Sequence, residues 1–365
     1  MKIGIDARMI EHSGIGTRIR FLLEKLPEFN KTHQFYLFGN EEVLNRYSFI
    51  KHYNVVSYNV PIYNAREFLG HPYMSEMDAL DIPHFNAPIN YINKCIVTIH
   101  DITPYRMKEF FGSPLKRMYL NLIFRILKYS RKVVTVSNFT ANDLVDAFGF
   151  SKTKMIKIYN GIDHKIFKPV SAEQVKSFKN KYGLPENYFL TIGIGKGHKN
   201  VDFLLRSLSR LWISDPQFPS LVIGGTGGRI PGYLERTILD LNINKYIIAF
   251  PKIEYEELPF LYAGAKLFLF PSLYEGFGFP PVEAQSSGCP VFSSNASALP
   301  EILGDSVAYF NPKDEIKFAL EITELIKNPD KLKKLSELGI INSGKYSWEN
   351  AARETIGLYN FIELK

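Results

Sequence analysis

Short apolar runs alternate with segments of helical periodicity along the whole chain. The apolar runs are rich in Val, Ile, Leu and Phe and are continuous rather than alternating. Such strands, separated by helices, predict parallel sheets that carry helices on both faces. The predicted strands of the first half are 2–7, 34–40, 54–60, 82–85, 95–101, 132–137 and 155–161. Those of the second half are 188–195, 221–225, 246–251, 266–272, 291–295 and 307–310.

Two such series in one chain predict two doubly wound α/β domains. The length of 365 residues agrees, because single cores stop growing at about 250–300 residues. Gly, Pro and polar residues gather in YNGIDHKIFKPV, residues 159–170, where we place the break. We therefore predict Rossmann-like domains over residues 1–165 and 166–347, with a C-terminal helix at about 348–365 that packs back on the first domain.

The two cysteines and the first residues of the chain indicate in which cellular compartment the protein works. Cys95 and Cys289 both lie in apolar, strand-like runs, which favours buried thiols in a reducing cytosol over a disulfide or a metal site. The opening MKIGIDARM enters a strand without a signal-peptide pattern. Apolar runs stay well below the roughly 18 residues of a membrane span. We expect a soluble cytoplasmic protein.

The net charge of +7 is concentrated in one segment. Residues 105–132 hold eight Lys or Arg and one Glu, whereas residues 166–365 hold 22 of each sign. Apolar residues recur there at helical spacing (Tyr119, Leu122, Ile123, Ile126 and Leu127). A basic amphipathic helix can contact an anionic membrane or a lipid-linked substrate, or can be a core helix with a solvated basic face. We expect no nucleic-acid binding, because no nucleic-acid-binding motif accompanies the charge.

Ligands of open α/β sheets bind beyond the carboxyl ends of the strands, so the residues after each strand are the candidates. After strand 2–7, Gly14 and Gly16 directly precede a helix, where a backbone could approach an anion. A plain turn would use the same glycines. After strand 95–101 stand His100 and Asp101. Catalytic residues are often found at this position, directly after a buried parallel strand. A histidine with a purely structural hydrogen bond would also fit there.

After strand 188–195 comes GIGKGHKN, in which glycines free the backbone and Lys196 and Lys199 precede a helix. This pattern is compatible with a phosphate site around Gly195 but lacks the Walker spacing. Solvated surface lysines are the alternative.

After strand 266–272 comes YEGFGFPPVEAQSSG. We expect Glu275 in the loop, Pro280 and Pro281 at a helix N-terminus, and Glu283 in the first turns of that helix, which Gly288 ends. The two acids would then lie on either side of a helix start rather than on one helix face. Acids there can also simply satisfy the helix dipole.

This last stretch resembles the E-x7-E motif of retaining glycosyltransferases of family 4, also called group 1. The similarity extends along nearly the whole chain in order. It includes SGIG (13–16), VTIHDITP (97–104), VSNFTANDL (136–144), YNGIDHKIFKP (159–169), KGHKNVDFLL (196–205), LPFLYAGAKLFLFPS (258–272) and SWENAARETIGLY (347–359). The resemblance implies the GT-B fold, in which two Rossmann-like domains flank an interdomain cleft.

The resemblance also implies a role for each matching residue. The first domain would take a saccharide or lipid-linked acceptor, and the second a nucleotide sugar such as a GDP- or UDP-hexose. Glu275 would hold hydroxyls of the donor sugar, and Glu283 those of the ribose. The backbone of Phe277, Gly278 and Phe279 would face the sugar and diphosphate. Lys199 would neutralise the diphosphate, Gly16 would approach it, and His100 would lie at the reacting face.

One departure concerns the second basic residue that the family has in its phosphate loop. Ile194 stands where that residue is usual, which leaves Lys196 as its replacement. No D-x-D element follows a strand, so we expect no metal. The resemblance implies retention through same-face attack, with the catalytic set His100, Glu275 and Lys199, in polysaccharide or cell-envelope glycan synthesis. The alternatives are a GT-B phosphorylase or epimerase, a dinucleotide oxidoreductase, and a non-catalytic sugar-binding protein.

Overall fold

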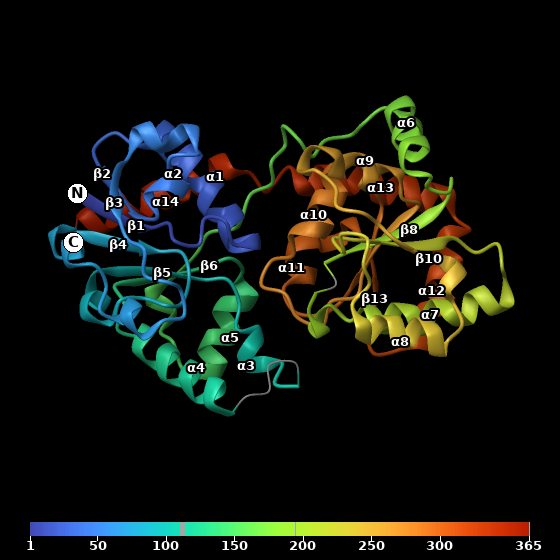
Figure 1. Cartoon of the computed structure of the whole chain (residues 1–365), viewed down its shortest axis with the longest axis horizontal. Helices are drawn as coiled ribbons and strands as arrows, with labels where there is room; N and C mark the ends of the chain where they lie inside the picture. Colours follow the sequence, from blue (N-terminus) through green and yellow to red (C-terminus); the bar gives the residue numbers. More distant parts are fainter. Residues whose placement is uncertain (110–113, 194, 365) are drawn as a thin grey trace. The chain divides into compact units, whose positions relative to one another are not determined.

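The computed structural model describes residues 1–109, 114–193 and 195–364, without the side chain of Lys116. The chain divides into two compact units, Met1–Gly161 with Tyr346–Lys365, and Ile162–Lys345 (Figure 1). Each unit is built on one parallel sheet with helices packed against it. The predicted fold class, two doubly wound α/β domains, is confirmed.

The sheet of the first unit has the strand order β3-β2-β1-β4-β5-β6-β7 among the described residues, with every pairing parallel. Its strands are β1 (Lys2–Asp6), β2 (Gln34–Gly39), β3 (Asn54–Ser57), β4 (Ala79–Ile82), β5 (Cys95–Ile99), β6 (Lys132–Thr135) and β7 (Met155–Lys157). The expected strand 82–85 was misplaced. The strand ends at Ile82, because Pro83 has no N–H for a sheet hydrogen bond.

Six α-helices belong to the described part of this unit. They are α1 (Ser13–Phe29), α2 (Glu41–Leu44), α3 (Thr103–Arg106), α4 (Pro114–Leu127), α5 (Asn138–Phe148) and α14 (Trp348–Glu363). The C-terminal α14 packs against α1, where the rings of Phe21 and Trp348 stack with centroids 5.3 Å apart. Gly161 lies so close that an added Cβ would be 2.2 Å from the backbone nitrogen of Trp348. Only glycine therefore fits where the chain passes α14.

The sheet of the second unit has the order β10-β9-β8-β11-β12-β13, again entirely parallel. Its strands are β8 (Tyr188–Ile192), β9 (Ser220–Gly224), β10 (Ile247–Ala249), β11 (Leu267–Phe270), β12 (Val291–Ser294) and β13 (Ala308–Phe310). The α-helices are α6 (Ala172–Tyr182), α7 (Val201–Ser214), α8 (Gly232–Asp240), α9 (Leu258–Gly264), α10 (Phe279–Ser286), α11 (Leu299–Leu303), α12 (Glu315–Ile326) and α13 (Pro329–Ser343). Both β8 and β11 are fully buried at most positions, as their continuous apolar sequences predict.

Short 3-10 segments connect these elements. Those of the first unit are Ser48–His52, Ala65–Phe68, Pro72–Glu76, Ile89–Lys94 and Lys152–Lys154. Those of the second unit are Gly197–Lys199, Asn244–Tyr246, Tyr255–Glu257 and Gly304–Ser306. Cys95 and Cys289 are buried free thiols. Across the described ranges, no helix combines the length and the apolar content needed to cross a membrane.

Candidate functional site

Lys199 and Glu275 form an ion pair at the carboxyl ends of two neighbouring strands. Lys199 ends the 3-10 segment that follows β8, and Glu275 lies in the loop that follows β11. The Lys199 Nζ atom is 2.5 Å from Glu275 Oε1, and the Ser272 hydroxyl donates to the same oxygen at 2.7 Å. Their side chains are only 20% and 12% exposed. Two residues that the sequence singled out separately are thus in direct contact.

Backbone hydrogen bonds hold both loops in place. The Glu275 N–H donates to Ser297 Oγ at 2.9 Å. Asn200 adopts the left-handed conformation at φ 58°, and its side-chain amide donates to the carbonyls of Pro271 and Pro312. The Asn200 amide therefore ties the loop after β8 to the loop after β11, which positions Lys199 against Glu275.

The helix α10 begins beside this pair, as predicted. Its N-cap is Gly278, whose φ of 88° favours glycine. Phe277 is buried and its ring packs on that of Phe279, with centroids 5.3 Å apart. The side chain of Phe277 therefore packs inside the protein beside the start of α10. The predicted helix end is also found, with Gly288 at φ 81°.

Glu283 lies in the second turn of α10 and accepts a 2.9 Å hydrogen bond from the hydroxyl of Tyr262 in α9. Burial raises the pKa of Glu283 to about 7, and the Tyr262 hydrogen bond offsets only part of that rise. The carboxyl therefore holds its proton to a higher pH than an exposed glutamate does.

Gly195 and Lys196 are exposed in the same loop as Lys199. No heavy atom lies within 4 Å of a Cβ added at Gly195, so packing in this unit does not require a glycine there. Ile194, the position of the family's second basic residue, lies outside the described residues. The assignment of Lys196 to a phosphate remains a prediction.

His100 and the two N-terminal glycines belong to the first unit. The His100 Nε2–H donates to the Pro83 carbonyl at 3.0 Å, which leaves Nδ1 as an acceptor. Burial lowers the pKa of His100 to about 4, and the nearby Arg18 adds to the effect. The imidazole is therefore neutral at physiological pH and can accept a hydrogen bond from a hydroxyl.

Gly14 and Gly16 lie inside the first turn of α1, because the helix begins at Ser13 rather than after the glycines. A Cβ added at Gly16 would be 2.4 Å from the Ile10 carbonyl oxygen. The close approach that requires this glycine is thus to its own chain. The approach of Gly14 and Gly16 to a ligand stays a prediction.

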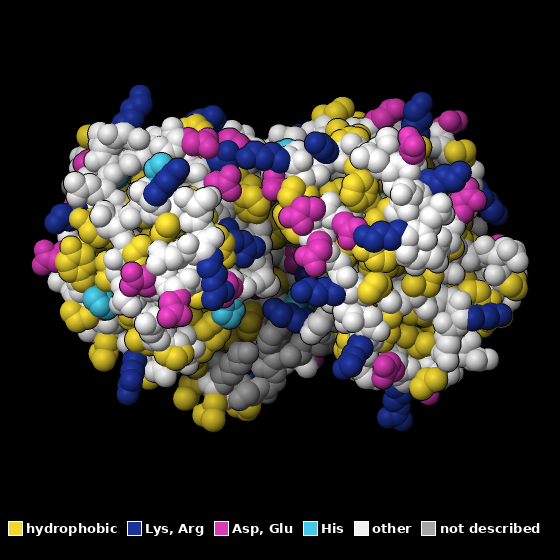
Figure 2. Space-filling model, turned by 45° about the horizontal axis from the view of Figure 1, so that its top comes forward, with side chains coloured by type: hydrophobic (Ala, Val, Ile, Leu, Met, Phe, Trp, Pro, Cys, Tyr) yellow, Lys and Arg dark blue, Asp and Glu magenta, His cyan; other side chains and the backbone are white. Residues whose placement is uncertain are grey.

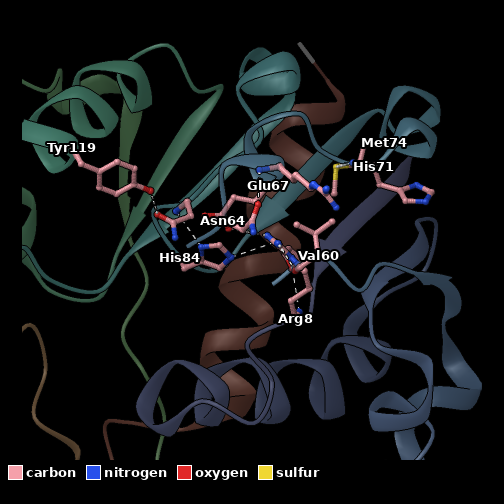
Figure 3. A network of polar contacts seen from close by, with 11 residues as sticks. Arg8, Val60, Asn64, Glu67, His71, Met74, His84 and Tyr119 are labelled. Carbon is pink, nitrogen blue, oxygen red and sulfur yellow. Dashed lines mark hydrogen bonds and ion pairs between the residues drawn. The ribbon is translucent and has the colours of Figure 1, made fainter. Parts of the chain in front are cut away.

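A buried network of charged residues at the carboxyl ends of β1 and β4 was missed from the sequence (Figure 3). Arg8 forms a forked pair with Asp6, with nitrogen–oxygen distances of 2.6 to 3.2 Å. Arg8 also donates to the Val60 carbonyl and, at 3.5 Å, to Glu67 Oε2. His84 Nε2 donates to Asp6 at 3.2 Å. The rule that found His100 could have found Arg8, which directly follows the predicted strand 2–7. It would have missed His84, because that residue fell inside the misplaced strand 82–85.

The network places two carboxyl groups, those of Asp6 and Glu67, against the single guanidinium of Arg8. The Asn86 N–H donates to His84 Nδ1 at 3.0 Å, and His84 Nε2 faces Asp6. Burial alone would raise the pKa of Asp6, but His84 and Arg8 outweigh it and hold that pKa well below its usual range. Burial raises the pKa of Glu67, and Arg8 offsets this only in part. Within the described residues, Glu67 Oε1 is buried without a hydrogen-bond partner.

No group of three or more His, Cys, Asp or Glu residues that could hold a metal occurs in residues 1–109, 114–193 and 195–364.

Two family models match the chain in sequence. Residues 173–340 match "Glycosyl transferases group 1", and residues 13–166 match "Glycosyltransferase Family 4". A curated relative, the O-antigen chain mannosyltransferase B of Escherichia coli, is 27% identical over 77% of this chain and 73% of its own. Other curated relatives are longer, and the chain spans about a third of their length.

Solved structures show the same fold. Sucrose-phosphate synthase from Thermosynechococcus elongatus superposes over 100% of this chain and 99% of its own, with a TM-score of 0.79 at 17% identity. HepE of Anabaena, solved with UDP and glucose, superposes over 99% of both chains with a TM-score of 0.76 at 17% identity. The fold and the family matches together define a GT-B glycosyltransferase. The chain belongs to glycosyltransferase family 4.

Proposed function

We propose that this enzyme transfers a hexosyl unit, of the mannose or glucose type, from a nucleotide-diphosphate sugar to a saccharide or lipid-linked acceptor in polysaccharide synthesis. The observation that carries the proposal is the Lys199–Glu275 ion pair, which lies just before the start of α10. Glu283 lies in the second turn of the same helix. On this proposal Lys199, the sugar-binding Glu275 and the ribose-binding Glu283 all lie at the carboxyl edge of the second sheet. Ligands bind at this edge in open α/β sheets.

In the proposed mechanism Lys199 stabilises the negative charge that develops on the departing diphosphate, together with the N-terminus of α10. Glu275 holds hydroxyls of the donor sugar, and Glu283 holds the ribose. The backbone of Phe277, Gly278 and Phe279 faces the sugar and diphosphate, and Lys196 with the Gly195 backbone supplies a second phosphate contact. Because Lys199 would supply a positive charge to the leaving group, we propose that transfer is independent of metal.

Retention of the anomeric configuration is part of the proposal. Attack on the face from which the diphosphate leaves lets a phosphate oxygen take the acceptor's proton, so neither Glu275 nor Glu283 acts as an acid. His100 accepts a hydrogen bond from a sugar hydroxyl through Nδ1. Gly14 and Gly16 support the diphosphate from the first domain.

For the acceptor we propose the network of Asp6, Arg8, Glu67 and His84. The unpartnered Glu67 oxygen is a hydrogen-bond acceptor that a saccharide hydroxyl can use. We also propose that the protein acts at the cytoplasmic face of a membrane, through the basic segment 105–132.

The test is a thermal-shift screen with GDP-, UDP- and ADP-sugars, because a ligand that binds the folded state raises its apparent stability. The named mannosyltransferase relative makes GDP-mannose the first sugar to test. Transfer to mannose-terminated acceptors is then followed with and without EDTA, and the anomeric configuration of the product is read by NMR. Donor hydrolysis or phosphorolysis without any acceptor-dependent transfer would point to a phosphorylase or epimerase instead.

A further inference from the structure

A series of polar contacts runs along the carboxyl edge of the first sheet, from β5 through β4 to β1. His100, which follows β5, donates to the carbonyl of Pro83, which follows β4. His84, the next residue, lies 3.2 Å from the carboxylate of Asp6 at the end of β1. Asp6 in turn holds the guanidinium of Arg8. The contacts therefore lead from His100 to Arg8 across three neighbouring strands.

Arg8 also lines a pocket where the loop that follows β1 meets the loop that follows β2. The volume of this pocket is about 110 Å³, well above the roughly 10–15 Å³ that a single water molecule needs. Arg8, Glu11 and His12 line it from the first loop, and Asn40 and Val43 line it from the second. Glu11, His12 and Asn40 are exposed, so the pocket is open to solvent. A ligand larger than water can therefore enter it.

The wall of the pocket combines hydrogen-bonding groups with an apolar side chain. His12 is the N-cap of α1 but makes no side-chain capping hydrogen bond, so its ring is not needed to hold the helix. Asn40 accepts the Val43 N–H through Oδ1, and its amide nitrogen is the group that can donate to a ligand. Val43 itself is half-buried. A few polar groups beside an apolar surface suit the hydroxyls and the C–H face of a sugar.

The charges around the pocket are matched, and this decides the class of ligand. The guanidinium of Arg8 is 2.6 Å from Asp6, and that of Arg46 is 3.3 Å from Glu11. Figure 2 likewise shows Lys, Arg, Asp and Glu side chains interspersed over the visible face of the first unit. A phosphate or a uronate would need a cation that is not already engaged, whereas Arg8 faces two carboxyl groups. An uncharged saccharide needs only hydrogen bonds.

We propose that this pocket binds the second sugar of the acceptor, so that the enzyme elongates a saccharide of at least two residues. The inference rests on the proposed function, in which the acceptor lies at the network of Asp6, Arg8, Glu67 and His84. The pocket is the next position along the same edge, because β2 lies about 4.8 Å beyond β1 and Arg8 belongs to both sites. The second sugar adds contacts away from His100, and it therefore acts on the affinity for the acceptor.

The test measures the acceptor KM of the whole chain, with the donor found in the thermal-shift screen. The acceptors are methyl α-mannoside and a set of methyl mannobiosides that covers the possible linkages. The pocket variants are Val43→Phe, which fills the pocket, and His12→Ala, which removes an exposed ring. Glu42→Phe is the matched control, because Glu42 is exposed in the same helix α2 and does not line the pocket. Thermal unfolding is measured on every variant.

In the wild type we expect the best disaccharide to have a KM about tenfold lower than the monosaccharide, because each further hydrogen bond contributes about 1 kcal/mol. In Val43→Phe and His12→Ala the ratio of the two KM values should fall to about threefold or less, since contacts of the second sugar are lost. The control Glu42→Phe should keep the wild-type ratio.

The proposal is overturned if no disaccharide has a lower KM than the monosaccharide, or if both pocket variants keep the wild-type ratio. A decyl diphosphate that carries one mannose is the third acceptor. If Val43→Phe weakens this acceptor alone, the pocket takes a diphosphate, and the proposal is again overturned. If no acceptor is glycosylated with any donor, the proposed function fails. The pocket is then tested by saturation-transfer NMR with the same saccharides, where equal binding of monosaccharide and disaccharides overturns the proposal and tighter disaccharide binding that Val43→Phe abolishes supports it.

Discussion

Lys199 Nζ and Glu275 Oε1 lie 2.5 Å apart across the carboxyl ends of β8 and β11. Without a ligand, each neutralises the other, and Ser272 supplies a second hydrogen bond to the carboxylate. In the proposed complex Lys199 turns to the diphosphate and Glu275 to the donor sugar. The pair therefore keeps both side chains ordered before the donor arrives.

Glu275→Ala should lower turnover about 100-fold, because the sugar loses the contact that positions its anomeric carbon. The KM for the nucleotide sugar should change much less. Steady-state kinetics with the donor found in the thermal-shift screen measures both. Wild-type turnover in this variant would show that Glu275 has no part in positioning the sugar.

Lys199→Met should lower kcat about 10² to 10³-fold, the usual effect of removing one group that stabilises a developing charge. The exposed Lys196 is the matched comparison, since it lies in the same loop. If Lys196→Met has the larger effect on kcat and on affinity for the nucleoside diphosphate, the roles of the two lysines must be exchanged.

Glu283 should make nucleotide binding depend on pH. Its pKa is raised to about 7, and the ionised form is the better acceptor for ribose hydroxyls, so affinity should increase between about pH 6 and 8. Glu283→Gln should bind more weakly and lose this dependence. Isothermal titration with the nucleoside diphosphate checks both, and an equal pH dependence in the variant would contradict the assignment.

The same pKa makes a prediction for stability. Between pH 4.5 and about 7 the unfolded carboxyl is ionised while the folded one holds its proton, so the folded state binds more protons. The contribution of Glu283 to stability is therefore present at low pH and is lost as the pH rises through this window. Glu283→Gln should gain thermal stability relative to the wild type at pH 8, but not at pH 4. A gain of the same size at both pH values would contradict the raised pKa.

Gly16→Ala should destabilise the first unit by about 1–3 kcal/mol, because the added Cβ would lie 2.4 Å from the Ile10 carbonyl oxygen. Gly357→Ala in α14 is the control, since no heavy atom lies within 4 Å of its added Cβ. Thermal and urea unfolding measure both. A Gly16→Ala protein of unchanged stability but poor donor affinity would favour a role in ligand binding alone.

Glu67→Gln should raise the KM for the acceptor about 10-fold or more and leave donor affinity unchanged, because a hydrogen bond to a buried charged group is lost. The exposed Glu76, which follows Glu67 in the segment between β3 and β4, provides the matched control Glu76→Gln. A Glu67→Gln protein with a lower melting temperature but an unchanged acceptor KM would show that the network is structural.

Most of the architecture could be predicted from the sequence, because continuous apolar runs have one stable solution, a buried parallel strand between helices. That rule also located His100, Lys199 and Glu275. It failed at β4, where the apolar residues of 82–85 belong to the strand end and the following turn and Pro83 stops the ladder. It also failed for Glu67, which lies in the short 3-10 segment Ala65–Phe68, far from the end of any strand and without a periodic signal.

Tertiary structure decided which of these residues are in contact and how burial shifts their pKa values. Residues 76 positions apart form the Lys199–Glu275 pair only because β8 and β11 are neighbours in the sheet. Burial, which depends on packing, moves the pKa of Glu283 up and that of His100 down. Packing also divides the apolar residues of α4 between a core face and an exposed face. The pattern of residue types determined the strands, the helices and the candidate chemistry, whereas distance and burial arise only when the chain is folded.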